Sequence, residues 1–191
     1  KVVDLGMAYV SALGLYGAAK PHMENLSKAV DQTISLAELD GSDIVYTGRV
    51  EVPKIVSVGV TVGARLPSAS TALGRVLLAA VPDPELHEVL STPSLSMYIP
   101  RTRYTVEQIR PRLQTVRDQG WAESDEDLQY GVQAIAAPLR GEGGNVVAAI
   151  GLGTHTSEIG KEVIRERYLP LLIETARNIE SDWSECRKLP T

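Results

Sequence analysis

The sequence contains no phenylalanine, a single cysteine and no long apolar run. The lone Cys186 excludes an internal disulfide, as is usual for proteins of reducing compartments. No stretch of about 18 consecutive apolar residues could cross a bilayer, and no signal-peptide pattern precedes the first helical pattern. We therefore expect a cytoplasmic protein without membrane contact.

A basic excess is also missing, because 19 lysines and arginines face 24 aspartates and glutamates and the net charge is -5. Domains that bind duplex DNA by themselves usually carry the opposite excess, since cationic side chains displace the counterions of the phosphates. A length of 191 residues fits one domain with one core. We expect an acidic single domain that does not bind DNA on its own.

The first third of the chain predicts helices followed by antiparallel strands. Apolar residues recur at four- and three-residue steps from Leu5 to Ala19, which predicts a helix that Pro21 ends. A second short helix is expected over His22–Val30, after which the apolar period changes to two. The expected strands run from 33 to a polar turn at 40–43, from 44 to 51, and from 55 to 62.

The remaining chain alternates between helical and strand patterns. Gly120 follows an amphipathic stretch and is expected to end a helix, because glycine adopts the left-handed conformation found there. Helices are expected over 72–79, 84–90, 106–119 and about 159–186, a loop over 93–102, and strands over 121–123, 131–140 and 145–153. Helices segregated around a mostly antiparallel sheet make the predicted class α+β.

Residues 65–79, RLPSASTALGRVLLA, place a polar turn directly before an amphipathic helix. Ser70 and Thr71 can cap the helix that Ala72 opens. Ala72, Leu73 and Gly74 then surround backbone N–H groups that have no partner within the helix, and such groups favour an anion. The segment predicts a binding site for a carboxylate.

A second signal is the run GWAESDEDLQYGVQAIAAPL at 120–139, where acidic residues lead through Gly131 into an apolar strand. Together with residues 65–79 and the VAAIGL run at 147–152, it resembles the effector-binding domain of the IclR family of bacterial transcription regulators. Residues 3–11 resemble the linker helix of that family. The segments 44–46, 49–50 and 65–67 are similar to the branch that senses aromatic acids and intermediates of the β-ketoadipate pathway.

The resemblance implies a fold and a domain organisation. It implies a GAF- or profilin-like fold with an antiparallel sheet flanked by helices, in which 1–20 form the linker helix and 21–191 the effector-binding domain. Family members carry a winged helix-turn-helix before the linker helix, and none of its residues occur in this chain. DNA would then be a partner only through that missing domain, and the chain would form a homodimer or homotetramer.

The resemblance also implies a pocket for a small organic acid. Backbone N–H groups of Ala72 and Leu73 would hold the carboxylate, Ser124 would supply a hydrogen bond, and apolar side chains would form the walls. The positions that match the family pocket are Val58, Leu66, Ala72, Leu73, Ser124, Val132, Ala134, Gly151 and Gly153.

Three of these positions depart from relatives that bind two- or three-carbon acids, which commonly have Ser or Cys there. Ala134, Gly151 and Gly153 remove polar contacts and volume, which predicts a larger, less polar cavity for an aromatic or longer acid. Gly151→Leu is then expected to fill the cavity in a folded protein. The alternative is that the glycines only permit tight packing of strand and helix.

Several charged residues have two interpretations. Arg65, Arg101 and Arg103 either pair with a second carboxylate or phenolate of the ligand or are surface charges. His155 is either a hydrogen-bonded loop residue or a polar contact at the pocket mouth. The acidic residues at 125–127 are expected in a solvated loop, with one of them reaching the pocket as the alternative. No spacing of His and Cys indicates a metal, and no cofactor motif occurs.

These patterns favour a ligand-sensing domain over two alternatives. The first alternative is a small cytosolic enzyme acting on an organic acid with Asp125 or Glu126 as base, although no nucleophile or cofactor motif supports it. The second is a dimerisation module with a filled core, which requires that no cavity exist between Ala72, Ala134 and Gly151. The sensor would control genes for the catabolism of its ligand.

Overall fold

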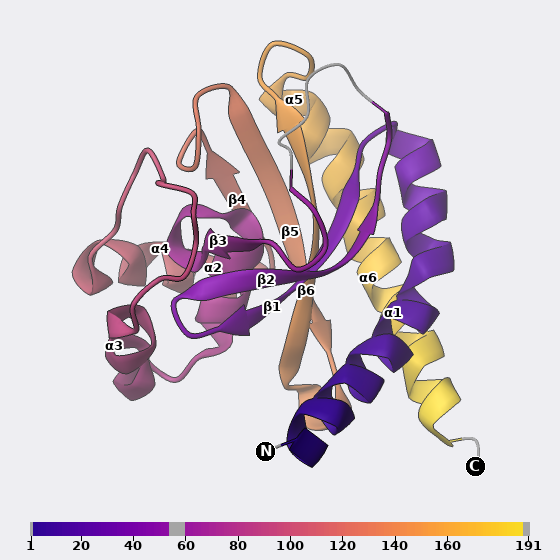
Figure 1. The fold of residues 1–191 in the computed structure, drawn as a ribbon. Helices are drawn as coiled ribbons and strands as arrows, with labels where there is room; N and C mark the ends of the chain where they lie inside the picture. Colours follow the sequence, from indigo (N-terminus) through magenta and orange to yellow (C-terminus); the bar gives the residue numbers. More distant parts are fainter. Residues whose placement is uncertain (1, 54–59, 189–191) are drawn as a thin grey trace.

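The fold is a six-stranded antiparallel sheet with helices on both faces (Figure 1). The computed structural model describes the backbone of residues 2–53 and 60–188 and the side chains of 14–53 and 60–185. The strand order β3-β2-β1-β6-β5-β4 confirms the predicted α+β class. The strands are β1 (Ile34–Asp40), β2 (Asp43–Val50), β3 (Arg65–Pro67), β4 (Ala122–Asp125), β5 (Val132–Arg140) and β6 (Val146–His155).

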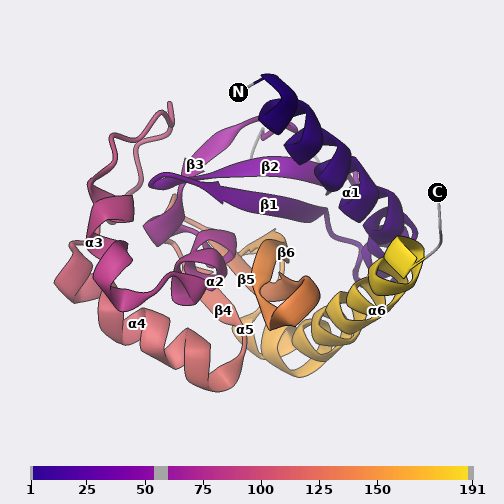
Figure 2. The same ribbon diagram turned by 90° about the horizontal axis from the view of Figure 1, so that it is seen from below.

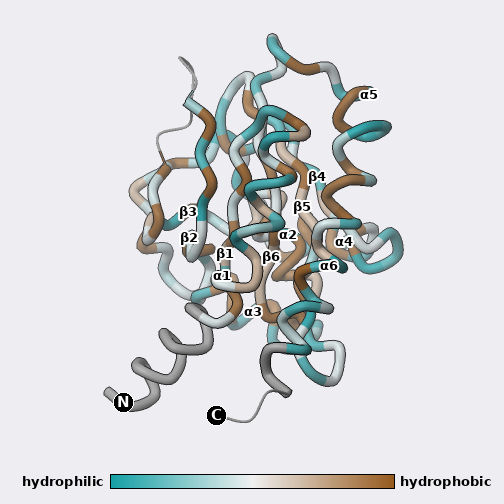
Figure 3. Tube along the Cα trace, turned by 90° about the vertical axis from the view of Figure 1, so that its right-hand side faces the viewer, coloured by the Kyte–Doolittle hydropathy of each residue, from teal (hydrophilic) through white to brown (hydrophobic). Residues whose placement is uncertain are grey.

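Two long helices cover one face of the sheet. The helices α1 (Val2–Val30) and α6 (Leu169–Lys188) lie side by side against it in both ribbon views (Figures 1 and 2). Their apolar side chains meet those of the sheet in the larger core. Figure 3 colours the chain by hydropathy and shows brown, hydrophobic segments along the strands and along α6. Fully buried members include Met23, Ile34, Ile150, Leu172 and Ile179.

Three shorter helices lie on the opposite face. The helix α2 (Ala72–Ala80) packs on the strands, with α3 (Asp83–Ser91) and α4 (Val106–Gln119) outside it (Figure 2). The smaller clusters around Val76 and Leu78 hold this layer together. Gly120 ends α4 with a φ of 82°, as the sequence predicts. The predicted hairpins of β1 with β2 and of β5 with β6 are confirmed.

The first helix is longer than the sequence predicts. Pro21 does not end it, and the expected second helix over His22–Val30 is its continuation. Proline removes one backbone hydrogen bond and usually kinks a helix, and α1 changes direction midway (Figure 1). Ala19 and Met23 on either side of Pro21 are both 0% exposed. Their burial against the sheet therefore compensates for the lost hydrogen bond.

Other boundaries also differ from the prediction. The strand expected over 55–62 lies largely outside the described residues, and its end at Val62 forms a turn. The short β3 instead pairs with β2. The last helix begins at α5 (Lys161–Val163), two residues after the expected Ile159, and continues through a π-helical turn (Ile164–Tyr168) into α6.

A bulge in β2 determines which residues face the two layers. Leu36 pairs with Gly48 but Ala37 pairs with Tyr46, so Thr47 is an extra residue. A bulge of this kind changes the faces on which the following side chains lie. Tyr46 packs in the cluster under α2, whereas Gly48 faces Tyr16 of α1, where a Cβ atom would lie 2.5 Å from the ring.

Candidate functional site

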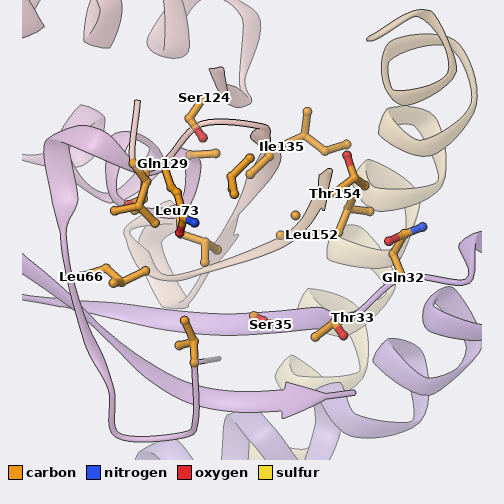
Figure 4. Close-up of a pocket in the computed structure, with 18 of the residues that line it drawn as sticks. Gln32, Thr33, Ser35, Leu66, Leu73, Ser124, Gln129, Ile135, Leu152 and Thr154 are labelled. Atoms are coloured by element: carbon orange, nitrogen blue, oxygen red, sulfur yellow. The ribbon is translucent and has the colours of Figure 1, made fainter. Parts of the chain in front are cut away.

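A cavity of about 290 Å³ lies between the sheet and the beginning of α2 (Figure 4). Leu66, Leu73 and Ser124 lie around one side of it, and Gln32, Thr33 and Thr154 around the other. Its volume is near the lower end of the range that small-molecule sites occupy. The cavity is therefore large enough for a compact organic ligand.

The floor of the cavity is made of small residues in register on neighbouring strands. Gly153 of β6 pairs with Ala134 of β5, which pairs with Ser124 of β4. Gly151 of β6 pairs with Ser35 of β1. Because large side chains are missing along these rows, the sheet leaves space beneath α2 instead of a filled core.

The roof of the cavity is the first turn of α2. The hydroxyl of Thr71 caps this helix by accepting a hydrogen bond from the Gly74 N–H at 3.1 Å. Ser70 is not the cap, because its hydroxyl donates to the Thr102 carbonyl at 2.7 Å. Within the described residues, the backbone N–H groups of Ala72 and Leu73 have no hydrogen-bond partner. The roof thus offers two donors at the positive end of a helix.

Gly151 and Gly153 differ in the space that is available to an added side chain. A Cβ atom at Gly151 would lie 2.6 Å from the Ile135 carbonyl oxygen and 3.1 Å from Leu73, so this glycine is needed for close packing. This geometry favours the packing interpretation for Gly151, although the residue also lines the cavity, so we expect Gly151→Leu to strain the fold as well as to fill the cavity. A Cβ atom at Gly153 would meet only the Gln133 oxygen, at 3.8 Å. Gly153 borders open space.

Most of the predicted pocket positions lie around this one cavity, although their contact with a ligand stays a prediction. Val58 falls outside the described residues. The positions that line the cavity are Leu66, Ala72, Leu73, Ser124, Val132, Ala134, Gly151 and Gly153.

The arginines proposed from the sequence lie elsewhere. Arg65 forms an ion pair with Asp40 and does not line the cavity. Arg101 lies 3.5 Å from Glu126 and 3.9 Å from the centre of the Tyr130 ring, and Arg103 is also absent from the cavity wall. Arg65 and Arg101 thus pair with carboxylates outside the cavity, and Arg103 is exposed.

His155 is the last residue of β6 and not a loop residue, and its contact with a ligand stays a prediction. It lines the cavity, and its Nδ1 atom lies 2.7 Å from the Ser157 hydroxyl. Its Nε2 atom would be 2.2 Å from a Cβ atom at Gly131, whose φ is 74°. Gly131 thus permits both the turn and the position of the imidazole.

Sequence reasoning missed the cationic residue of the cavity wall, Arg49. It follows the β2 bulge and lines the cavity with Tyr46 from the same strand and Tyr98 from the loop after α3. Burial raises the pKa of Tyr46 to about 12, with the charge of Arg49 acting in the opposite direction. The strand pattern alone gave no sign of the bulge.

The acidic run is not a uniformly solvated loop, because Asp127 is buried. It is 8% exposed and pairs at 2.8 Å with Arg75 of α2, which is 4% exposed. Tyr104 donates a hydrogen bond to its other oxygen. Burial raises the pKa of Asp127, but the bond from Tyr104 and the charge of Arg75 outweigh it and leave the pKa below its usual range. Asp127 does not line the cavity.

The structure does not meet the requirements of the two alternative functions, which are a catalytic base in the cavity and a filled core. Asp125 pairs with Lys161 and Glu126 with Arg101, and neither proposed base lines the cavity. A module with a filled core is contradicted by the cavity that Ala72, Ala134 and Gly151 line.

In the part of the chain that the structure describes, no cluster of three or more His, Cys, Asp or Glu side chains could hold a metal, and no helix is long and apolar enough to span a membrane.

Comparison with known proteins gives one consistent result. Residues 7–181 match the family model described as bacterial transcriptional regulator IclR, C-terminal. The chain is 36% identical over 180 residues to the Pca regulon regulatory protein of Pseudomonas putida, covering 94% of this chain and 62% of that protein. The chain thus spans less than two thirds of the length of this relative.

Two solved structures with bound aromatic acids are similar to this chain. The double mutant of the PobR inducer-binding domain from Acinetobacter, in complex with 3-hydroxybenzoic acid, has a TM-score of 0.76 and 27% identity, over 85% of this chain and 95% of that one. An IclR homologue from Microbacterium hydrocarbonoxydans, in complex with 4-hydroxybenzoate, has a TM-score of 0.77 and 29% identity, over 91% and 70%.

Proposed function

The chain belongs to the IclR family of bacterial transcriptional regulators as an effector-binding domain, and from this premise we propose that its effector is a small organic acid bound in the cavity under α2. The observation that carries the proposal is the helix start at Ala72 and Leu73, since both residues line the cavity and their N–H groups have no partner among the described residues. Such a helix end favours a carboxylate by dipole and by direct hydrogen bonds.

The size and lining of the cavity support an aromatic or dicarboxylic acid. A volume of about 290 Å³ exceeds the need of a two-carbon acid, and Leu66, Val132 and Ala134 offer apolar contact. The benzoate ligands of two similar structures agree with this class. Val58, Leu73, Ser124, Gly151 and Gly153 complete the proposed set of ligand-binding residues.

The intact regulator is proposed to convert this binding into a change in DNA affinity. Its DNA-binding domain would be joined through the N-terminal part of α1, with residues 1–20 as linker helix and 21–191 as effector-binding domain. A ligand changes DNA affinity only if it binds two subunit arrangements of a homodimer or homotetramer unequally. The relatives are named regulators, which supports a cytoplasmic location and control of genes for aromatic catabolism.

The test is a calorimetric and thermal-shift panel of protocatechuate, 4-hydroxybenzoate, β-ketoadipate, pyruvate and glyoxylate. A ligand at about 100 times its dissociation constant adds roughly 2.7 kcal/mol to the free energy of unfolding. Methyl 4-hydroxybenzoate is the matched control for 4-hydroxybenzoate, because it keeps the ring and loses the carboxylate charge. We expect the ester to bind about ten- to a hundredfold more weakly. Equal binding of ester and acid would remove the proposed role of the helix start.

A further inference from the structure

Arg49 is placed in the cavity wall by the bulge in β2. Its side chain is only 12% exposed. Its Nη1 atom donates to the Ser35 hydroxyl at 3.2 Å, and Ser35 is its partner in the register of β1 and β2. Among the described residues that line the cavity, Arg49 is the one lysine or arginine. The wall therefore has a single fixed cation on the β2 side.

Among the residues that the structure describes, the hydrogen-bond partners of Arg49 use only part of its guanidinium. Its Nε atom donates to Glu51 at 2.8 Å, but the Glu51 side chain is 63% exposed, and ion pairs of this kind contribute little. The bonds to Glu51 and Ser35 use two of the five N–H groups that a guanidinium carries. Arg75 differs, because its bonds to Ala69, Glu123 and Asp127 occupy all three of its nitrogen atoms.

Tyr46 gives this corner a second donor. Its ring centre lies 6.0 Å from the Arg49 guanidinium carbon, within the range of a cation–π contact. Such a contact helps to orient the planar guanidinium, whose N–H groups form a fork of donors. A tyrosine phenol is protonated at neutral pH, so Tyr46, which also lines the cavity, can donate a hydrogen bond there. A planar fork beside a phenol and a serine hydroxyl suits an acidic oxygen group better than an apolar one.

We propose that Arg49, with Ser35 and Tyr46, forms a second oxyanion subsite, so that the effector carries an acidic oxygen group at the end opposite its carboxylate. The ligand class is then a dicarboxylate or a hydroxyaromatic acid. The inference rests on the proposed function, since it takes the start of α2 as the site of the first carboxylate. It assigns to Arg49 the role that the sequence suggested as one interpretation of Arg65, Arg101 and Arg103.

The separation of the two subsites fits such a ligand. Leu73 of α2 lies over Gly151 of β6, where an added Cβ atom would be 3.1 Å from its side chain. Ser35 of β1 pairs with Gly151 on one side and with Arg49 of β2 on the other. The backbones of Gly151, over which Leu73 lies, and of Arg49 are thus two strand spacings apart, or roughly 10 Å. A benzene ring or a short chain with a polar group at each end can bridge this distance.

The experiment measures dissociation constants for two ligand pairs that differ only in the second group. The pairs are 4-hydroxybenzoate with benzoate, and adipate with its monomethyl ester. We expect the second acidic group to improve binding to the unmodified chain by about ten- to a hundredfold in at least one pair. The responding pair identifies the source as a hydroxyaromatic acid or a dicarboxylate.

The variant Arg49→Gln is expected to reduce this preference to below about threefold while changing the affinity for the monoacid little. Arg65→Gln is the matched control, because Arg65 pairs with Asp40 outside the cavity, and it should keep the preference. Arg49→Lys keeps the charge but not the fork and should retain part of the preference. Thermal unfolding establishes that each variant is folded, and Arg49→Lys provides the comparison if Arg49→Gln is not.

Three results would overturn the inference. A wild-type chain that binds the monoacids as tightly as the diacids has no second subsite, although the proposed function would stand. If Arg49→Gln or Arg49→Lys weakens the binding of both members of a pair by the same factor, Arg49 holds the first carboxylate and not a second group. If no acid binds at all, the proposed function fails, and this inference fails with it.

Discussion

At the scale of single residues, the two glycines of the cavity floor support opposite expectations. Neither has a positive φ, so the backbone at both positions accepts other residues. Gly153→Val fills open space, and we expect acid binding at least tenfold weaker with a free energy of unfolding within about 1 kcal/mol of the original. Gly151→Ala drives a Cβ atom against the Ile135 carbonyl and should cost about 1–3 kcal/mol. Calorimetry and urea unfolding measure the two effects, and a stable Gly151→Ala would contradict the packing argument.

Asp127 and Asp40 allow a matched comparison of a buried and an exposed ion pair. Asp127→Ala leaves the buried Arg75 without a counter-charge and should lower the free energy of unfolding by about 3–5 kcal/mol at pH 7. Asp40→Ala removes a partner that is 60% exposed and should cost less than about 1 kcal/mol. Urea unfolding of both variants checks this order, and similar losses would show that burial does not decide the energetics here.

The pH dependence of the Asp127 effect follows from its lowered pKa. A carboxyl with a lower pKa in the folded state contributes stability above its unfolded pKa of about 3.9 and loses it as the pH falls through the folded value. The destabilisation by Asp127→Ala should therefore shrink when unfolding is measured below about pH 4.

Residue types predicted part of the cavity, but not its cation. The family resemblance predicted the small floor residues Ala134, Gly151 and Gly153, and capping chemistry predicted the helix start at Ala72. Both signals are local in the sequence. Arg49 could not be predicted to line the cavity, because one extra residue in β2 sets its side and a bulge depends on pairing with β1. The burial of Asp127 likewise depends on Arg75, which lies 52 residues away in the sequence.

At the scale of elements, α2 and α4 have comparable N-caps but different surroundings. Thr71 accepts from the Gly74 N–H at 3.1 Å, and Thr105 accepts from the Gln108 N–H at 3.3 Å. Changing either to Ala should cost about 0.5–2 kcal/mol of stability. Only Thr71→Ala should weaken acid binding, by roughly three- to tenfold, because it loosens the helix start that holds the carboxylate. Titration of both variants with one acid tests this, and equal losses of affinity would separate the helix start from binding.

Local signals correctly predicted the end of a helix or strand where residues next to it in the sequence determine that end. The stop at Gly120 and the turn at 40–43 were correct because a left-handed glycine and a polar turn are decided within a few residues. The prediction that Pro21 ends the first helix was wrong, because the contacts of Ala19 and Met23 that compensate for the proline come from the sheet, which is distant in the sequence. The short β3 was missed because three residues carry no period.

At the scale of the whole molecule, the sheet separates the cavity from the layer of α1 and α6. The strand β2 belongs to both sides, since Arg49 lines the cavity and its neighbour Gly48 packs against Tyr16 of α1. The family predicted from the sequence is confirmed. In the proposed function α1 connects this domain to the DNA-binding domain, and the structure has a strand of the cavity wall packed directly against that helix.

The chain as a whole should give no sequence-specific complex with operator DNA. Its net charge is -5 and its isoelectric point about 5.3, so it lacks the cationic excess that displaces counterions from phosphates. The family match of residues 7–181 is to the C-terminal domain of these regulators. A gel-shift titration at physiological salt, with and without 4-hydroxybenzoate, measures this, and the full-length regulator is the positive control. A specific complex of the chain alone below about 1 μM, within the range of true operator binders, would contradict the assignment of DNA binding to a separate domain.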